Sequence, residues 1–356
     1  KDGYLTGFTS NEILNVNKWD NHSPYLYETY LELINDAGEL LEVIPYRVGF
    51  RRIEILDKVM YLNGKRLVIV GVNRHEWNPR TGRCIGKDDM VTDINCMKRN
   101  NINAVRTCHY PAQIPWYYLC DEAGIYVMAE TNLESHGSFQ KLGAIEPSWN
   151  VPGSFPQWKE VVIDRARTNY ETFKNHTSIL FWSLGNESYA GDDIEAMNRF
   201  FKEKNDGRLV HYEGSFHNRA YEDTISDVES RMYAKPYEIE EYLSNNPKKP
   251  YILCEYMHDM GNSLGGLGSY MKLIDKYEMY QGGFIWDFID QALIVKDEVT
   301  GEEVLRYGGD FDDRPSDYEF SGIISLEGES KVGEEFMEFY PNEDAIKETV
   351  VNLFYE

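Results

Sequence analysis

Two glutamates in this chain each follow a short apolar run of the kind that forms a buried parallel strand. Glu187 lies in the string FWSLGNES (residues 181–188), and Glu255 lies in YILCEYMH (residues 251–258). If both runs belong to one parallel barrel, the strand ends meet on a single face and bring the two carboxylates to one rim. Cleavage of a glycosidic bond requires such a pair, because one carboxyl group protonates the leaving oxygen and the other attacks the sugar.

Each glutamate also has an alternative interpretation as a buried ion-pair partner or a charge at a helix end, the commoner role for a single glutamate. As a general acid, Glu187 needs a raised pKa, which a partly apolar and partly anionic pocket provides. As a nucleophile, Glu255 must stay ionised and needs cationic or hydrogen-bonding neighbours. Arg106 and Tyr233 follow other predicted strands and are expected to supply them, and the amide of Asn186 is suited to a sugar hydroxyl.

The string ESH places Glu134 and His136 two residues apart, so on an extended segment they share one side. Together with Glu187 they form an oxygen-rich group with one imidazole, which suits Mg²⁺ better than Zn²⁺. An ordinary surface pair is the alternative, because a carboxylate and a histidine at this spacing are a weak signal alone.

Four further polar or aromatic residues occupy predicted rim positions. Three of the eight histidines, His75, His109 and His258, fall there and are expected to hydrogen-bond ligand hydroxyls, although each one alone could be a structural histidine. Trp286 is either a core residue or a platform for the face of a sugar.

Eight apolar runs separated by helical patterns predict a (β/α)8 barrel over residues 59–325. The runs are residues 67–72, 103–107, 125–129, 179–182, 209–212, 226–232, 251–254 and 283–286. A helix is expected over residues 88–99, with Asp88 as N-cap and with Met90, Ile94 and Met97 on its core face. An open doubly wound sheet is the rival fold, but it gives no reason for polar residues after so many strands.

The ends of the chain differ from this pattern. Residues 1–58 contain two predicted strands, 25–33 and 40–50, and are interpreted as part of a small β-sandwich. Residues 326–356 are interpreted as a C-terminal extension or a truncated following domain. The first residues do not form a signal peptide and look cut from a longer chain, so an upstream signal stays open.

Composition excludes several classes of partner. The net charge of −24 over 356 residues repels phosphate backbones, so no nucleic acid is expected. No stretch approaches the roughly 18 apolar residues that span a bilayer. The five cysteines form no metal-type pair and no even disulfide set, which favours reduced thiols and a cytoplasmic protein.

Several strings together resemble the β-galactosidases of glycoside hydrolase family 2, and the resemblance covers about residues 19–322. The string CEYMHDMGN (residues 254–262) favours the galactosidase branch over the β-glucuronidases. The strings that carry the resemblance are residues 71–76, 105–111, 134–137, 182–188, 232–234, 252–266, 282–291 and 307–311.

The resemblance implies an immunoglobulin-like domain leading into a (β/α)8 barrel, with Glu187 as acid/base and Glu255 as nucleophile. It implies an active-site Mg²⁺ held by Glu134, His136 and Glu187, and it places Arg106 and Tyr233 beside the nucleophile. The residues implied to line the galactose pocket are His75, His109, Asn186, His258 and Trp286.

The resemblance also implies a substrate and Na⁺ contact near Phe320. Family members carry an Asn-Gly pair shortly after this phenylalanine, and the string FSGI (residues 320–323) lacks that Asn. The expected sodium contact therefore rests on Phe320 alone.

The leading interpretation is a retaining hydrolase that removes terminal β-D-galactosyl residues from β-galactosides such as lactose by double displacement. Another activity of the same family, β-glucuronidase or β-mannosidase, is the second interpretation. The third is an inert sugar-binding fragment, because the chain resembles only a catalytic core. A homo-oligomer is a further possibility for the full-length protein.

Overall fold

The structure, a computed structural model, describes residues 12–136, 150–259, 265–308 and 310–311. Eight strands form one parallel sheet in the order β10-β9-β8-β7-β6-β13-β12-β11. They are β6 (Ile69–Asn73), β7 (Ala104–Arg106), β8 (Tyr126–Glu130), β9 (Ile179–Ser183), β10 (Leu209–His211), β11 (Glu229–Met232), β12 (Tyr251–Tyr256) and β13 (Tyr280–Ile285).

The two strands at the ends of this order, β10 and β11, are joined by contacts of the residues around them. The N–H of Asp227 donates to the carbonyl oxygen of Val210 over 2.9 Å, and the N–H of Val210 donates to Asp227 Oδ2 over 2.6 Å. His211 Nε2 lies 2.8 Å from Ser230 Oγ. These contacts complete the ring, so the barrel predicted from the eight apolar runs is confirmed.

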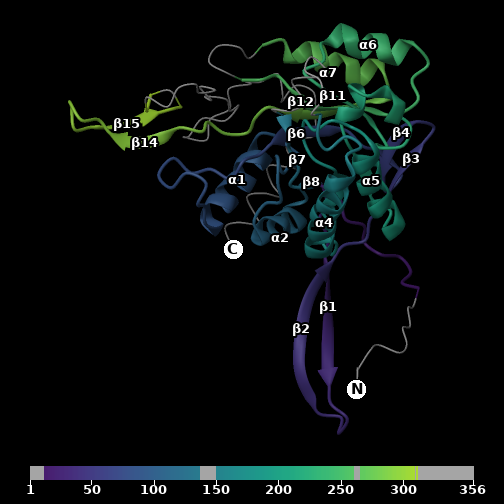
Figure 1. Ribbon diagram of the computed structural model, residues 1–356. Coiled ribbons are helices and arrows are strands. Elements are labelled where there is room, and N and C mark those ends of the chain that lie inside the picture. Colours follow the sequence, from purple (N-terminus) through teal and green to yellow (C-terminus); the bar gives the residue numbers. More distant parts are fainter. Residues whose placement is uncertain (1–11, 137–149, 260–264, 309, 312–356) are drawn as a thin grey trace.

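Helices follow most of the barrel strands and surround them (Figure 1). The helices are α1 (Lys87–Arg99), α2 (Ile114–Ala123), α4 (Pro156–Phe173), α5 (Asp192–Lys204), α6 (Pro236–Ser244) and α7 (Leu267–Lys276), with short 3-10 turns η1 (Gly214–Phe216) and η2 (Arg219–Tyr221) after β10. Within the described residues, no helix combines the length and the apolar character needed to cross a bilayer.

Helix α1 confirms the expected core face, since Met90, Ile94 and Met97 are all buried. The expected N-cap at Asp88 is wrong, because the N-cap of this helix is Gly86. The carboxylate of Asp89 accepts the N–H of Gly86 over 2.8 Å, so the cap lies two residues earlier than expected and the helix begins at Lys87. Asp88 and Asp89 both lie in the first turn, where acidic side chains are favoured, and it is Asp89 that makes the capping hydrogen bond.

The interior of the ring is filled by large side chains from different strands. Phe181, Met128, Ile252 and Phe284 belong to one buried cluster. A Cβ atom at Gly71 would lie 2.5 Å from the ring of Phe284, so the glycine makes room for this ring. The barrel is therefore a packed core that holds its rim residues in place.

A small antiparallel sheet of β3 (Ile53–Leu56), β4 (Val59–Leu62) and β5 (Lys65–Arg66) lies at the start of the barrel strands. The side chain of Gln281, at the beginning of β13, accepts the N–H of Met60 over 2.7 Å and donates to the carbonyl of Leu67 over 2.6 Å. This sheet therefore caps the end of the barrel opposite to the predicted site.

Two hairpins extend from the barrel (Figure 1). The hairpin of β1 (Tyr27–Ile34) and β2 (Leu40–Val48) is the part of the expected β-sandwich that the described residues form, and most of its side chains are exposed. Its base, next to the barrel, contacts α2, where Arg47 Nη1 lies 2.7 Å from Glu122 Oε1. The second hairpin pairs β14 (Leu293–Lys296) with β15 (Glu303–Arg306).

Candidate active site

Arg106, the last residue of β7, is the centre of a buried network at the C-terminal end of the barrel. Its guanidinium is fully buried and donates to Glu130 Oε2 over 2.7 Å and to Glu255 Oε1 over 2.9 Å. It also donates to the side-chain oxygens of Asn73, at 2.9 Å, and Asn186, at 2.8 Å. One planar cation thus joins side chains from β6, β8, β12 and the segment after β9.

Glu255 has a hydrogen-bond donor on each carboxylate oxygen. Arg106 donates to Oε1, and the hydroxyl of Tyr233 donates to Oε2 over 2.7 Å. Burial and the negative charge of Glu255 both raise the pKa of Tyr233, so this hydroxyl stays protonated and donating. The charged form of a buried carboxylate is stabilised by such a pair of donors.

Burial of Arg106 would by itself lower the pKa of its guanidinium. The charges of Glu130 and Glu255 outweigh this effect and hold the pKa of Arg106 well above its ordinary value. Arg106 therefore remains a cation in contact with Glu255, as the sequence interpretation required.

Glu187 lies four residues beyond the end of β9, with a side chain that is 20% exposed. Its φ of 37° lies in the left-handed region, which is uncommon for a residue with a side chain. The preceding Asn186 is held from both sides: its N–H donates to Leu133 O over 2.8 Å, and its side chain accepts from Arg106. The network thus connects Glu255 to the residue next to Glu187.

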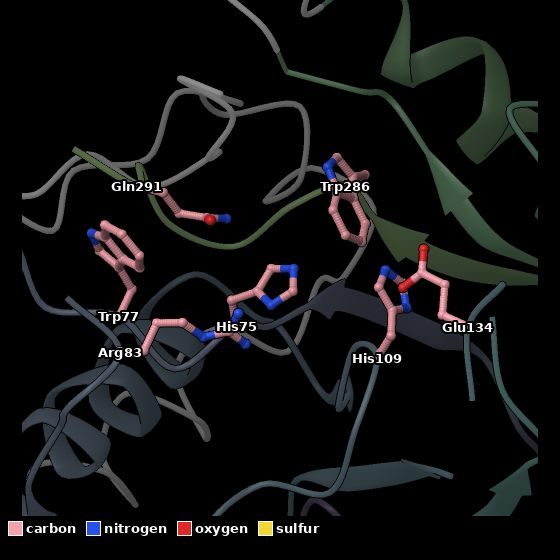
Figure 2. Close-up of a pocket in the computed structure, with 7 residues that line it drawn as sticks. All are labelled: His75, Trp77, Arg83, His109, Glu134, Trp286 and Gln291. Carbon is pink, nitrogen blue, oxygen red and sulfur yellow. The ribbon is translucent and has the colours of Figure 1, made fainter. Parts of the chain in front are cut away.

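Aromatic and polar residues surround a cavity of about 260 Å³ beside this network (Figure 2). The ring of Trp286 is stacked on that of His109, with centroids 5.1 Å apart and an interplanar angle of 4°, and His75 meets Trp286 edge-on at 5.5 Å. The lining residues are His75, Trp77, Arg83, His109, Glu134, Trp286 and Gln291. A flat indole beside polar side chains is a surface that suits one sugar ring.

The two pocket histidines are neutral at neutral pH. Burial, followed by the charge of Arg106, lowers the pKa of His109 to about 3. Its Nδ1 lies 2.8 Å from Glu130 Oε1, a carboxylate that needs a donor, so Nδ1 carries the proton and Nε2 is an acceptor. Burial and the neighbouring His109 lower the pKa of His75 well below its ordinary value, and its Nδ1 contacts Tyr110 Oη at 2.9 Å.

The two remaining residues predicted for the sugar pocket have different outcomes. The ring of His258 lies 5.8 Å from that of Tyr233, which contacts Glu255, and His258 is not among the residues that line the cavity. Phe320 lies outside the described residues, and the sodium contact stays a prediction.

The residues expected to hold Mg²⁺ are brought together. One ligand atom from each of Glu134, His136 and Glu187 falls within 4.8 Å of the others, and His136 Nδ1 contacts Glu187 Oε2. Burial raises the pKa of Glu134, and the charges of Glu130 and Glu255 contribute to the rise. Two carboxylates and one imidazole in an anionic setting fit a hard divalent cation.

Two buried glutamates of the site were missed in the sequence. Glu130 ends β8 and accepts hydrogen bonds from Arg106, His109 and Ser183. Glu213 follows β10, and its Oε1 accepts the N–H of Glu187 over 2.7 Å. Both directly follow predicted apolar runs, residues 125–129 and 209–212, as Glu255 follows residues 251–254, and this position is the signal that could have found them.

Comparison with known proteins agrees with this architecture. The description "Glycosyl hydrolases family 2, TIM barrel domain" matches residues 53–332, and "Glycosyl hydrolases family 2" matches residues 4–51. The class defined by the fold and the site is thus a barrel hydrolase with several carboxylates at the C-terminal end of its strands. The chain belongs to glycosyl hydrolase family 2.

Curated relatives extend well beyond this chain. The chain is 70% identical over 309 residues to a "Beta-galactosidase large subunit" of Lactobacillus helveticus, covering 86% of the chain and 49% of that protein. It is 60% identical over 308 residues to a "Beta-galactosidase" of Halalkalibacterium halodurans, covering 86% of the chain and 30% of that protein. The chain therefore spans about half the length, or less, of these relatives.

Solved structures of lower identity share the fold. A β-glucuronidase from Ruminococcus gnavus in complex with C6-substituted uronic isofagomine superposes with a TM-score of 0.67 at 20% identity, covering 92% of this chain and 59% of that one. A Lactobacillus rhamnosus β-glucuronidase superposes with a TM-score of 0.67 at 20% identity, covering 91% of this chain and 58% of that one.

Proposed function

We propose that this chain is the catalytic core of a retaining β-galactosidase. The observation that carries the proposal is the pairing of both oxygens of the buried Glu255 with donors, Arg106 and Tyr233, as a carboxylate nucleophile requires. Curated relatives that are 54–70% identical carry the name β-galactosidase, which favours galactose as the sugar.

The chemistry has two steps. Glu187 gives its proton to the glycosidic oxygen while a carboxylate oxygen of Glu255 forms a bond to C1, and the C1–oxygen bond to the leaving alcohol breaks. Glu187, now ionised, takes a proton from water, whose oxygen attacks C1 and releases Glu255. Two inversions at C1 retain the β configuration, and the product is galactose.

Covalent labelling tests the nucleophile and the sugar together. The full-length protein is treated with a 2-deoxy-2-fluoro-β-galactoside that carries an activated leaving group, and the labelled peptide is identified by mass. The expected result is one label on the peptide that contains Glu255, and no label in Glu255→Gln. A label on another carboxylate would overturn the assignment, as would normal turnover by the Glu255→Gln variant.

We also propose that Glu134, His136 and Glu187 hold Mg²⁺, because their donor atoms converge and suit this cation. A bound Mg²⁺ would supply a fixed positive charge that orients groups beside Glu187. Calorimetric titration of the full-length protein with Mg²⁺ is expected to give one site that is lost in Glu134→Gln. EDTA should lower activity and Mg²⁺ restore it. Equal binding by both proteins, with no effect of EDTA, would contradict the site.

One observation favours a second candidate, a β-glucuronidase. Arg83 lines the cavity, at the opposite end from Glu134 in Figure 2, and none of the described carboxylates forms an ion pair with it. Its guanidinium lies over the ring of Tyr110, 4.6 Å from the ring centroid, and is the kind of group that would bind the carboxylate of a glucuronide. Rates with nitrophenyl β-galactoside and β-glucuronide distinguish the two. Preference for the glucuronide, lost in Arg83→Ala, would replace the leading proposal.

The relatives also bear on assembly. The four relatives at 67–70% identity are named large subunits, whereas the relatives at 54–60% identity are named simply β-galactosidase. We infer that the full-length protein assembles with a second, smaller chain. Light scattering and denaturing gels of the protein purified from its source are expected to give two polypeptides in a fixed ratio. A homo-oligomer of a single polypeptide would contradict this inference.

A further inference from the structure

The segment directly after β10 touches the backbone of the proposed acid/base residue. Glu213 is 4% exposed, and its Oε1 accepts the N–H of Glu187 over 2.7 Å. The neighbouring Tyr212 is fully buried, and its hydroxyl accepts the N–H of Ser188 over 3.1 Å and donates to the carbonyl oxygen of Ser188. Two consecutive side chains of one strand end thus bind two consecutive residues after β9.

The backbone they hold is in an unfavourable conformation. Glu187 has a φ of 37°, and the left-handed region costs a residue with a Cβ atom about 1–2 kcal/mol. Such a residue persists only where its surroundings determine the conformation. The N–H of Glu187 would lose its partner if the peptide turned, so the hydrogen bond to Glu213 favours the observed orientation.

The contact is also tightly packed. A Cβ atom at Gly214 would lie 2.9 Å from the carbonyl oxygen of Ser188 and 2.5 Å from the ring of Tyr212. The strand end therefore lies directly against the turn, and the absence of a side chain at Gly214 permits this close approach.

Other roles for Glu213 fit the structure less well. Its ligand atoms converge with those of His211 and Cys254, but both ring nitrogens of His211 are already engaged, with Ser183 Oγ and Ser230 Oγ. A metal there would have to break both contacts. Glu213 is also almost fully buried, so it is not placed to touch a sugar in the cavity.

We propose that Glu213 and Tyr212 form a clamp that orients Glu187, which makes Glu213 a positioning residue for proton transfer. The proposal rests on the role of Glu187 as acid/base given above. The clamp acts through the acceptor oxygen of Glu213, and a substitution that removes this acceptor lets the carboxyl group of Glu187 move away from the glycosidic oxygen.

Substrates with different leaving groups test the clamp in the full-length protein. An alkyl β-galactoside needs a proton on its leaving oxygen, whereas 2,4-dinitrophenolate leaves without one. General acid catalysis contributes about 10²–10⁴-fold, so Glu213→Leu is expected to lower kcat/KM for the alkyl galactoside by about 100-fold. The loss for the dinitrophenyl galactoside is expected to be less than about 5-fold, since its first step needs no acid.

The matched control is Glu213→Gln, which has the same shape and keeps a carbonyl oxygen that accepts the N–H of Glu187. Both substrates should then react at close to the wild-type rate. Azide, which attacks C1 without help from a base, should raise the turnover of the dinitrophenyl galactoside by Glu213→Leu and leave that of Glu213→Gln unchanged. Equal losses for both substrates in Glu213→Leu would overturn the proposal, as would a Glu213→Gln variant as impaired as Glu213→Leu.

Two further variants keep the result interpretable. If Glu213→Leu does not fold, Tyr212→Phe removes only the hydroxyl that holds Ser188, and it should give the same dependence on leaving group with a smaller loss. No such dependence in Tyr212→Phe would then count against the clamp. Glu187→Ala must give the full dependence. If Glu187→Ala shows no dependence on the leaving group, the proposed function fails. If Glu187→Ala shows this dependence and Glu213→Leu does not, only the clamp is wrong.

Discussion

At the scale of single residues, Arg106 determines whether the site can exist in the form described. Its guanidinium reaches four acceptors in different directions, among them Glu130 and Glu255. An ammonium group has three donors at one point and cannot reproduce this planar fork. Displacing a catalytic group by about 1 Å can cost roughly 100-fold in rate, so Arg106→Lys is expected to lower kcat/KM by about this factor.

Steady-state kinetics of the full-length protein measure this loss. The control is Arg167→Lys, on the exposed surface of α4, where the arginine contacts only Asp164 three residues earlier. Its kcat/KM should equal that of the wild type. Comparable rates for Arg106→Lys and Arg167→Lys would show that the fork geometry is unimportant.

Tyr233 gives a second prediction at this scale. Its hydroxyl is the donor to Glu255 Oε2, and a hydrogen bond to a charged group contributes about 1.5–3 kcal/mol. Tyr233→Phe is expected to slow formation of the covalent intermediate by about 10–100-fold, which pre-steady-state kinetics would measure. Tyr237→Phe, at an exposed tyrosine on α6, is the matched control and should have no effect. An unchanged rate in Tyr233→Phe would exclude a role for this donor.

The sequence placed Glu187 and Glu255 near one rim because each comes at or after the end of an apolar run, and a barrel brings its strand ends together. It did not predict Glu130 or Glu213, although they occupy equivalent positions. The position after a strand says that a carboxylate is near the rim, but it does not say which partner it meets. Arg106 contacts both Glu130 and Glu255. The contact with Glu255 joins residues 149 positions apart in the chain, so it depends on the geometry of the barrel.

At the scale of elements, the C-terminal turn of α1 carries a partly buried cation. Lys98 Nζ donates to the carbonyl oxygen of Ala123 over 2.9 Å, which fastens α1 to the end of α2. Burial lowers the pKa of Lys98 to about 8. Between about pH 8 and the ordinary lysine pKa of 10.5, the unfolded chain binds more protons than the folded one, so stability rises with pH.

Chemical denaturation at several pH values tests this linkage by comparing the wild type with Lys98→Met. The free energy of unfolding of the wild type, relative to the variant, is expected to increase above pH 8 by up to about 1 kcal/mol per pH unit. Below pH 8 the difference should be constant. Parallel profiles for the two proteins across this range would mean that Lys98 is not buried as described.

The presence of the strands and helices was predicted from the sequence more reliably than the residues at which they begin and end. All eight barrel strands were expected, because apolar runs of this length between helical patterns have few other uses in a parallel fold. The N-cap of α1 was assigned to Asp88 and lies at Gly86, because two adjacent aspartates give the same signal. Asp89 makes the capping hydrogen bond to Gly86, and the sequence alone does not say which of two adjacent aspartates bonds back to the preceding loop.

At the scale of the whole molecule, the hairpin of β1 and β2 differs from the barrel because its apolar side chains are exposed. Leu31 and Leu33 lie on one face of β1, and Leu31 pairs across the hairpin with Ile44. All three side chains are more than 40% exposed. The sequence predicted these strands, but alternation alone does not say what covers their apolar faces. An exposed apolar hairpin of this kind favours association between chains.

The chain expressed alone is therefore expected to self-associate through this hairpin. Replacing the cross-strand pair by Leu31→Glu and Ile44→Lys removes two apolar side chains and keeps an attractive pair, so the hairpin can persist. Sedimentation velocity should show a lower proportion of oligomers for this double variant than for the wild type. The control is Val299→Lys, at a solitary apolar residue that is 94% exposed between β14 and β15, and it should sediment as the wild type does. If the double variant and Val299→Lys both match the wild type, association uses another surface, because only the double variant alters the hairpin.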